Sequence, residues 1–244
     1  MPDPFGWSHS DLASIPPLSN GEVHIYATAL TADSAWSAEA QRVLDETEKA
    51  RAARFRFEED RFRFQKTRAL LRLLLASYLE HEATEIRFHE GPHGKPYLRE
   101  GIDDLQFNVS HTKGASVLAF ARGIEVGIDI EHSQRKVDVE GVGRRVFTSA
   151  ERASIHGLGA SSGLRQFFRL WTAKEAYLKA TGSGLSCDPA TIEGDFESQQ
   201  YKSAERVGEV LPYSLREVAT DNRFVVALAH QQCETPELRL GEIA

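Results

Sequence analysis

The order of the predicted secondary-structure elements indicates an α+β fold built from two similar halves related by a pseudo-two-fold axis. In residues 1–123 we expect a strand, a helical stretch, a long helix and then three strands, and residues 124–244 repeat that order. The distance from the first strand to the middle of the long helix is also similar in the two halves. We interpret this as an internal duplication and expect a ligand cleft at the seam between the halves. One continuous α/β sheet is the alternative.

The elements of the first half follow from hydrophobic periodicity and from turn residues. VHIYATAL (23–30) partly alternates polar and apolar residues, as a strand does, and helical patterns follow over 35–53 and 59–80. GPHGKP (91–96) is a turn because of its glycine and proline content. Three strands are predicted from EIRFHE (85–90), LQFNVSH (105–111) and ASVLAFA (115–121).

The second half opens with the strand EVGIDIE (125–131), followed by a helix near 149–156. Thr148, Ser149 and Glu151 have the pattern of a capping box at the start of that helix. FFRLWTAKEAYLKATG (167–182) predicts the longer helix, and Gly182 is a signal for its C-terminal end. The closing strands are predicted from ATIEGDFE (190–197), YSLREVA (213–219) and RFVVALAHQ (223–231).

Composition is that of a soluble globular protein, with 41% hydrophobic and 27% charged residues among 244. The formal net charge of −7 argues against a general polyanion-binding surface, so any basic site must be local. Cys187 and Cys233 match no zinc or redox spacing and predict free thiols of a cytoplasmic protein, a structural disulfide being the less favoured alternative. Without a signal-peptide pattern or an 18-residue apolar stretch, we expect a cytoplasmic location and no membrane association.

Two carboxylates stand on one face of the strand 125–131. Because side chains alternate along a strand, the apolar residues point one way, and Gly127, Asp129 and Glu131 point the other. Like charges this close repel each other. Mg²⁺ would relieve the repulsion, since it takes oxygen ligands and leaves positions for a substrate phosphate. The wet face of an amphipathic strand is the alternative.

The helix 167–182 places charged residues in and beside an apolar stripe. Lys174 lies near the middle of the stripe, Glu175 at its edge, and Lys179 one turn beyond Glu175 on the same side. A buried charge without a partner is strongly unfavourable, so we expect these groups to be paired. A surface Glu–Lys pair is the alternative to a functional site.

VGIDIE followed by LWTAKEAYLKATGSGLS resembles the signature of the Sfp-type 4'-phosphopantetheinyl transferases. RFRFEEDRFRFQKTRALLR (54–72), GKPYL (94–98) and FNVSHT (107–112) resemble further segments of that family, and the likeness covers most of 44–186. The resemblance implies a pseudo-two-fold pair of α+β halves and a monomeric enzyme. It also implies Mg²⁺-dependent transfer of phosphopantetheine from coenzyme A to a serine of an apo acyl or peptidyl carrier protein, with Mn²⁺ as an alternative metal.

Position by position, the resemblance assigns roles to individual residues. Asp129, Glu131 and Glu175 are implied to hold the metal, Glu175 also to activate the serine hydroxyl, and Lys179 to stabilise the departing phosphate. The implied contacts to coenzyme A are Arg51, Arg63, Lys95, Pro96, Ser110, His111 and Lys174.

One position departs from the family pattern. Glu48 is acidic where relatives often have a basic residue, which leaves open how the 3'-phosphate is held. Arg51, with help from His111, is the favoured substitute. For His111 itself, a structural hydrogen-bonding role is the alternative.

Other functions and partners were weighed against this prediction. A non-catalytic coenzyme A-binding protein and a Mg²⁺-dependent phosphohydrolase are the rival functions, and the complete set of acidic residues with Lys179 favours the transferase. The arginine- and phenylalanine-rich run 51–72 suggests nucleic-acid stacking, but its acidic residues and the negative net charge argue against it. Segment 133–163 is either a loop that meets the carrier or a surface loop without function. Candidates for docking an acidic carrier are Arg135, Lys136, Arg144 and Arg145.

Overall fold

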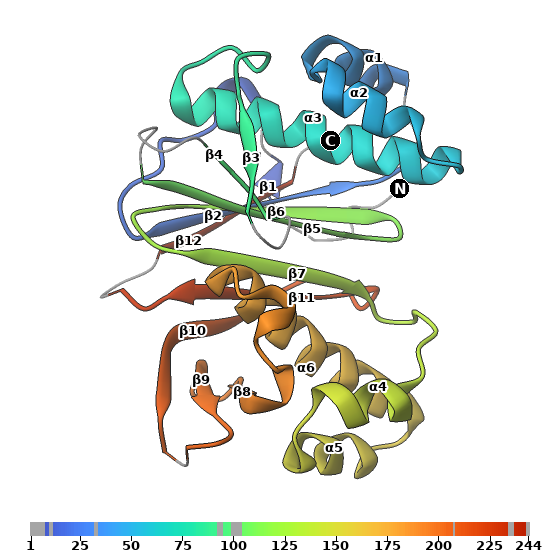
Figure 1. Cartoon of the computed structure of the whole chain (residues 1–244), viewed down its shortest axis with the longest axis vertical. Helices are drawn as coiled ribbons and strands as arrows, with labels where there is room; N and C mark the ends of the chain where they lie inside the picture. Colours follow the sequence, from blue (N-terminus) through green and yellow to red (C-terminus); the bar gives the residue numbers. More distant parts are fainter. Residues whose placement is uncertain are drawn as a thin grey trace.

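The computed structural model describes residues 8–9, 12–31, 34–91, 95–98, 104–206, 208–233 and 237–242. Two five-stranded sheets lie face to face in the middle of the molecule, and a long helix covers the outer side of each (Figure 1). The molecule is therefore a four-layer α-β-β-α sandwich, which confirms the expected α+β fold.

The elements follow the same order in both halves. The first half contains β2 (Glu22–Ala29), α1 (Ser34–Val43), α2 (Glu46–Ala53), α3 (Glu58–Leu79), β3 (Phe88–Glu90), β4 (Pro96–Leu98), β5 (Leu105–Thr112) and β6 (Ala115–Arg122). The second half contains β7 (Val126–His132), α4 (Val139–Val146), α5 (Ser149–His156), α6 (Ala160–Thr181), β8 (Ile192–Asp195), β9 (Gln200–Ser203), β10 (Val210–Val218) and β11 (Phe224–Gln231). Two further strands, β1 (Ser8–His9) and β12 (Glu237–Glu242), come from near the two ends of the chain.

The strand order of the two sheets confirms the internal duplication. The first sheet has the order β1-β12-β2-β6-β5, and the second has the order β7-β11-β10-β9-β8. In each, the first strand of the half pairs antiparallel with the last, and the preceding strand follows. The long helices α3 and α6 each have 22 residues. The alternative of one continuous sheet is wrong.

Apolar side chains from both sheets form the central core. Val23 and Ile25 of β2 pack in one cluster with Ile128 and Ile130 of β7, as strand alternation predicts. The outer faces of the sheets form separate cores, one with α3 and the others with α6. The acidic face of β7 is thereby directed toward α6, not into the central core.

The strand β12 corrects the assignment of all residues from 124 to 244 to the second half. It pairs in parallel with β2 and so extends the first sheet. Leu238 and Leu240 of β12 add to the core between the sheets. Parallel pairing between distant segments leaves no local pattern by which the sequence could have revealed it.

Several local predictions are confirmed and others are refined. The capping box at Thr148 and the C-cap at Gly182 are present. The stretch 35–53 forms two helices because Asp45 caps the second one. The strand predicted at 85–90 is shorter, and α4, β4 and β9 were not expected. Part of the predicted turn, 92–94, lies outside the described residues.

Two further expectations bear on the setting of the protein. Cys187 and Cys233 are free thiols, as expected. None of the helices in the described part of the chain combines the length and apolar character that crossing a bilayer requires.

Candidate active site

The candidate site lies at the seam between the halves, where β5 runs beside β7. Since β7 is the outer strand of its sheet, one of its edges has no strand partner within that sheet. Side chains of β5 supply part of what a neighbouring strand would provide. The Ile128 N–H donates to Asn108 Oδ1 at 2.9 Å, and the Ile130 N–H donates to Ser110 Oγ at 3.4 Å. The two halves are thus joined along the strand that carries the acidic residues.

Gly127 allows α6 to approach β7 closely. A Cβ atom at this position would lie 2.2 Å from the carbonyl oxygen of Ala176 and 2.3 Å from the amide nitrogen of Ala180. These two alanines are one helical turn apart, so the helix crosses directly over the glycine. Asp129 is on the same face of β7, two residues further along, and therefore lies close to α6.

Asp129 is buried and contacted by two groups at one of its oxygens. Lys179 Nζ lies 2.6 Å from Oδ1, and Ser110 Oγ donates to the same oxygen at 2.7 Å. Lys179 also donates to Ser110 Oγ at 3.0 Å and to the Ile128 carbonyl at 3.3 Å. The second oxygen, Oδ2, is buried and has no hydrogen-bond partner among the residues that the structure describes. A buried carboxylate oxygen without a partner is unfavourable, so this atom is suited to receive a cation.

Glu131 and Glu175 share the electrostatic environment of Asp129. Burial raises the pKa of Glu175, and the nearby charge of Asp129 raises it further while Lys179 opposes the shift. Burial also raises the pKa of Glu131, and the guanidinium of Arg135, whose Nη2 lies 2.9 Å from Oε1, opposes it. Asp129 is therefore close enough to each of the other two carboxylates to raise its pKa.

The same three carboxylates do not yet form a closed metal site. Within the described ranges, no three His, Cys, Asp or Glu side chains are grouped closely enough to hold a metal ion. Lys179 pairs with Asp129, and Arg135 pairs with Glu131. In this arrangement, side-chain cations neutralise two of the acids.

Lys95 connects the first half to the end of α6. Its ammonium donates to the carbonyl oxygens of Lys179 at 2.5 Å and Ala180 at 3.3 Å. These carbonyls are at the negative end of the helix, where a cation is stabilising. Burial lowers the pKa of Lys95. The structure therefore places this ammonium against the helix that carries Lys179.

Three of the residues expected to contact the coenzyme line one cavity. Arg51, Pro96 and His111 surround a space of about 200 Å³. Burial and the nearby Arg63 cation lower the pKa of His111, so its imidazole is neutral at pH 7. The charges of Lys179 and Asp129 also act on the pKa of His111, so this cavity lies near the acidic cluster.

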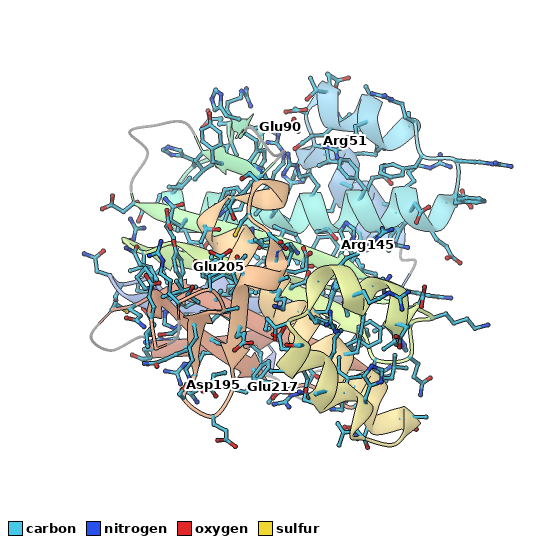
Figure 2. All side chains as sticks on the ribbon, turned by 60° about the horizontal axis from the view of Figure 1, so that its bottom comes forward. Arg51, Glu90, Arg145, Asp195, Glu205 and Glu217 are labelled. Carbon is cyan, nitrogen blue, oxygen red and sulfur yellow. The ribbon has the colours of Figure 1, made fainter. Side chains whose placement is uncertain are left out.

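A larger cavity of about 1070 Å³ shares Arg51 with the smaller one. Its lining combines four arginines, three phenylalanines and three acids: Arg51, Arg54, Arg68 and Arg87, Phe55, Phe64 and Phe88, and Asp45, Glu48 and Glu90. Arg51 and Glu90 lie near each other beside it, with 3.6 Å between Nη1 and Oε1 (Figure 2). The two cavities together offer a surface of arginines and aromatic rings, with acids among them, that leads from α2 toward β5.

Two predicted coenzyme contacts, Arg63 and Lys174, do not line either of these cavities. Arg63 pairs with Asp60 at 3.0 Å and lines a different cavity. Lys174 is buried on another side of α6, where its ammonium lies 2.8 Å from Glu151 Oε2. Its partners confirm that a charge within the apolar stripe is paired, but they are far in sequence from the acidic strand.

Glu48 has a structural role that the sequence left open. It is buried, and Arg68 Nε and Arg72 Nε each donate to it at 2.6 Å. It also completes the capping box of α2 with Asp45. Its negative charge is thus neutralised by arginines and does not offset Arg51.

Sequence reasoning missed some residues of the seam. Asn108 and Thr112 belong to it, since Asn108 contacts the β7 backbone and Thr112 Oγ1 donates to Glu131 Oε2 at 3.4 Å. A signal was present, because polar residues occupy every second position of FNVSHT at Asn108, Ser110 and Thr112. Arg68 gave no such signal among the many arginines of its helix.

Comparisons with known proteins show which family this chain resembles. Residues 125–229 match the model of the 4'-phosphopantetheinyl transferase superfamily, and residues 31–122 match that of the 4'-phosphopantetheinyl transferase N-terminal domain. The chain is 32% identical over 214 residues to 4'-phosphopantetheinyl transferase HetI from Nostoc sp., covering 87% of this chain and 89% of that protein. It is 29% identical over 230 residues to L-aminoadipate-semialdehyde dehydrogenase-phosphopantetheinyl transferase from Xenopus laevis, covering 83% and 74%. A solved holo-(acyl-carrier-protein) synthase from Bacillus anthracis, in complex with CoA (3',5'-ADP), overlaps 44% of this chain and 94% of its own, with a TM-score of 0.34 and 23% identity.

Proposed function

Because the chain belongs to the 4'-phosphopantetheinyl transferase superfamily, we propose that it transfers 4'-phosphopantetheine from coenzyme A to a serine of an apo carrier protein. The released product is adenosine 3',5'-bisphosphate. The observation that carries the proposal is the buried cluster at the seam, in which Lys179 and Ser110 meet on Asp129 with Glu131 and Glu175 nearby.

We propose that Asp129, Glu131 and Glu175 hold Mg²⁺, with Mn²⁺ as an alternative. The donor set fits, since all three supply the carboxylate oxygens that these hard cations take. The buried Oδ2 of Asp129 without a partner also fits. When bound, the metal would supply charge neutralisation at the pyrophosphate of the coenzyme. Lys179 and Arg135 must then release the carboxylates with which they now pair.

The nucleotide part of coenzyme A is proposed to occupy the two cavities. Its 3'-phosphate needs cations, and Arg51 and Arg54 are exposed in the larger cavity. The adenine can stack on the phenylalanines there. Pro96 and His111 border the smaller cavity, and the charges of Asp129 and Lys179 act on His111, so a pyrophosphate bound there would lie near the acidic cluster. Lys174 is left out of this set because it is buried elsewhere.

The proposed reaction is the attack of a serine hydroxyl on the phosphorus that carries the pantetheine arm. Glu175 takes the hydroxyl proton, and burial, which raises its pKa, makes it a better proton acceptor than an exposed glutamate. The new P–O bond forms as the bond to the bridging pyrophosphate oxygen breaks, and the departing bisphosphate keeps that electron pair. Lys179 stabilises the charge that grows on the leaving phosphate.

Carrier docking is proposed on the surface that follows β7. Arg135, Lys136, Arg144 and Arg145 are all exposed there, which suits an acidic partner. Arg145, on α4, is marked in Figure 2. We propose a monomeric enzyme, because the cluster is built from one chain, and a cytoplasmic location, which free thiols suit.

The test is an intact-mass assay with coenzyme A, Mg²⁺ and a panel of apo carrier proteins, with and without a chelator. A metal-dependent gain of one phosphopantetheine on a carrier serine is the expected result. Loss of coenzyme A without carrier modification would indicate the phosphohydrolase instead. Tight coenzyme A binding with no modification of any carrier would indicate a non-catalytic binding protein.

A further inference from the structure

Lys174 is a fully buried cation in the middle of the helix that carries Glu175 and Lys179. It is 1% exposed. Its ammonium contacts Glu151 Oε2 at 2.8 Å and donates to the carbonyl oxygens of Pro189, at 2.8 Å, and Ile192. These acceptors belong to the N-terminus of α5 and to the segment that leads through η3 (Pro189–Thr191) into β8. One side chain thus ties α6 to two other elements.

The first half contains the same arrangement around Arg72. Arg72 is 0% exposed and donates through Nε to Glu48 Oε2 at 2.6 Å. Through Nη1 it donates to the carbonyl oxygens of Ala83 at 2.8 Å and Ile86 at 3.0 Å. Each long helix therefore carries a buried cation with a glutamate and two carbonyl partners, and Arg72 has a further partner in Asp45, to whose Oδ2 its Nη2 donates at 2.8 Å.

The correspondence extends to the detail of both sets. Glu48 and Glu151 are each the N3 residue of a capping box, on the short helix that precedes the long one. Arg72 and Lys174 occupy the same position in two helices of equal length. The two carbonyls are three residues apart in both halves, directly after the long helix in the first and after η2 (Gly184–Ser186) in the second. The duplicated fold thus keeps this anchor twice.

We propose that Lys174 is a positioning residue that fixes the rotation of α6, so that Glu175 and Lys179 face Asp129. Adjacent residues of a helix point in directions about 100° apart, so fixing Lys174 also fixes Glu175. Rotating the helix would withdraw the ammonium from three acceptors and leave Glu151 buried with an uncompensated charge. Since the same anchor in the first half supports a helix without the acidic cluster, the anchor is part of the frame and not a phosphate contact.

A double-mutant cycle on Lys174→Met and Glu151→Gln tests the proposal. Each single variant removes one charge and leaves the other buried, so we expect Tm to fall by roughly 10 °C. For the folded single variants at 25 °C, kcat should fall about 100-fold because Glu175 and Lys179 are misplaced. The KM and the calorimetric Kd for coenzyme A should stay within about twofold.

The double variant is the decisive measurement. Removing both charges leaves no uncompensated ion, and the glutamine oxygen can still accept the Thr148 N–H, as Glu151 Oε2 does now at 2.9 Å. We expect it to recover at least about tenfold in kcat and half of the Tm loss, since coupled residues are not additive. The matched control is Lys202→Met, which breaks a partly exposed pair with Asp195 in the same half and should change neither quantity measurably.

A different pattern would overturn the assignment. If Lys174 contacted the coenzyme, Lys174→Met would weaken coenzyme A binding about tenfold, Glu151→Gln would not, and the double variant would resemble the lysine variant. The activity readouts rest on the proposed function. If the wild type modified no carrier, the Tm cycle and the coenzyme A titration would still decide whether the pair anchors α6.

Discussion

The two halves of the molecule share a strand order but fill the space between sheet and long helix differently. In the first half that space holds large rings. His24 and Tyr26 of β2 face α3, and the Tyr78 hydroxyl lies 2.7 Å from His24 Nδ1 and 3.0 Å from the Tyr26 hydroxyl. Phe120 stands opposite His24 on β6. These side chains pack against one another beneath α3.

In the second half the corresponding positions are small or acidic. When β2 and β7 are aligned by the residues that they contribute to the central core, His24 corresponds to Gly127 and Tyr26 corresponds to Asp129. Ala229 stands opposite Gly127, where the first half has a phenylalanine. Small residues let α6 approach, and a carboxylate replaces a tyrosine beneath it.

The free edge of β7 is the second difference. The corresponding edge of β2 is covered by β12, whereas side chains of β5 and Lys179 contact the edge of β7. The two halves therefore share one framework of strands and a long helix. They differ in a few side chains and in one strand edge without a strand partner, and these differences create the candidate site. The predictions below test that division.

The largest effect is expected from removing the acid that α6 holds and α3 lacks. Glu175 follows Lys174 in α6 as Leu73 follows Arg72 in α3, so the two positions correspond. Glu175→Gln should lower kcat for carrier modification about 1000-fold or more, because one residue serves as proposed base and metal ligand. Rates of carrier modification measured by intact mass, with Tm measured in parallel, test this expectation.

The matched control is Glu217→Gln, a carboxylate of the same half that pairs with Arg169 at 2.7 Å on the surface (Figure 2). It should retain full activity. Activity of Glu175→Gln within tenfold of the wild type, with the fold intact, would place the base and the metal elsewhere.

A methyl group at Gly127 is expected to have the next largest effect. Gly127→Ala would place a Cβ 2.2 Å from a backbone carbonyl of α6, where no side chain can move aside. We expect a loss of about 3 kcal/mol and a Tm lower by roughly 6–12 °C. Thermal unfolding measures it, with Gly157→Ala as control, since the nearest atom there is 3.5 Å away. Equal Tm values for the two variants would mean that α6 is not held close by the glycine.

Local patterns were sufficient to predict the elements that carry the site. The alternation of VGIDIE and the stripe of 167–182 put Asp129, Glu131, Glu175 and Lys179 on the correct faces. The distance between these two elements could not be derived from local pattern, because it depends on Gly127 meeting the alanines of α6. Only the resemblance to a family linked them before the structure did.

Contacts between distant segments explain what the sequence did not reveal. Lys174 was expected to need a partner, but the choice of Glu151 and two carbonyls depends on how α5 and η3 pack against α6. Glu48 appeared to be a departure from a binding pattern, although it is the counterpart of Glu151. The capping-box pattern of both was visible, and its pairing with a buried cation was not.

The buried histidine of the first half should make stability depend on pH. Burial lowers the pKa of His24, so the folded protein binds a proton there less readily than the unfolded chain does. The stability that its neutral ring provides is complete above about pH 6.5 and declines as the pH falls below that value. Urea unfolding at pH 7.5, 6.5 and 5.5 should therefore show His24→Gln less stable than wild type at pH 7.5. Below pH 6.5, the difference in unfolding free energy between the two proteins should narrow by up to about 1.4 kcal/mol per pH unit. A constant or widening difference would contradict this.

The smallest effect concerns the C-cap residues of the two long helices. Both have a left-handed backbone conformation, but they are of different types: the C-cap of α6 is Gly182, with φ 65°, and the C-cap of α3 is Glu80, with φ 53°. A side chain in that conformation costs about 1 kcal/mol, and glycine avoids the cost. Glu80→Gly should therefore raise Tm by roughly 2–4 °C, and Gly182→Ala should lower it by a similar amount. An alanine at 182 would meet no atom of the described part of the chain within 4 Å, so we attribute any loss there to backbone strain. Tm shifts of opposite sign for the two variants would show that the C-cap of α3 is strained and that of α6 is not. Equal Tm shifts of one sign would show that Glu80 makes a compensating contact.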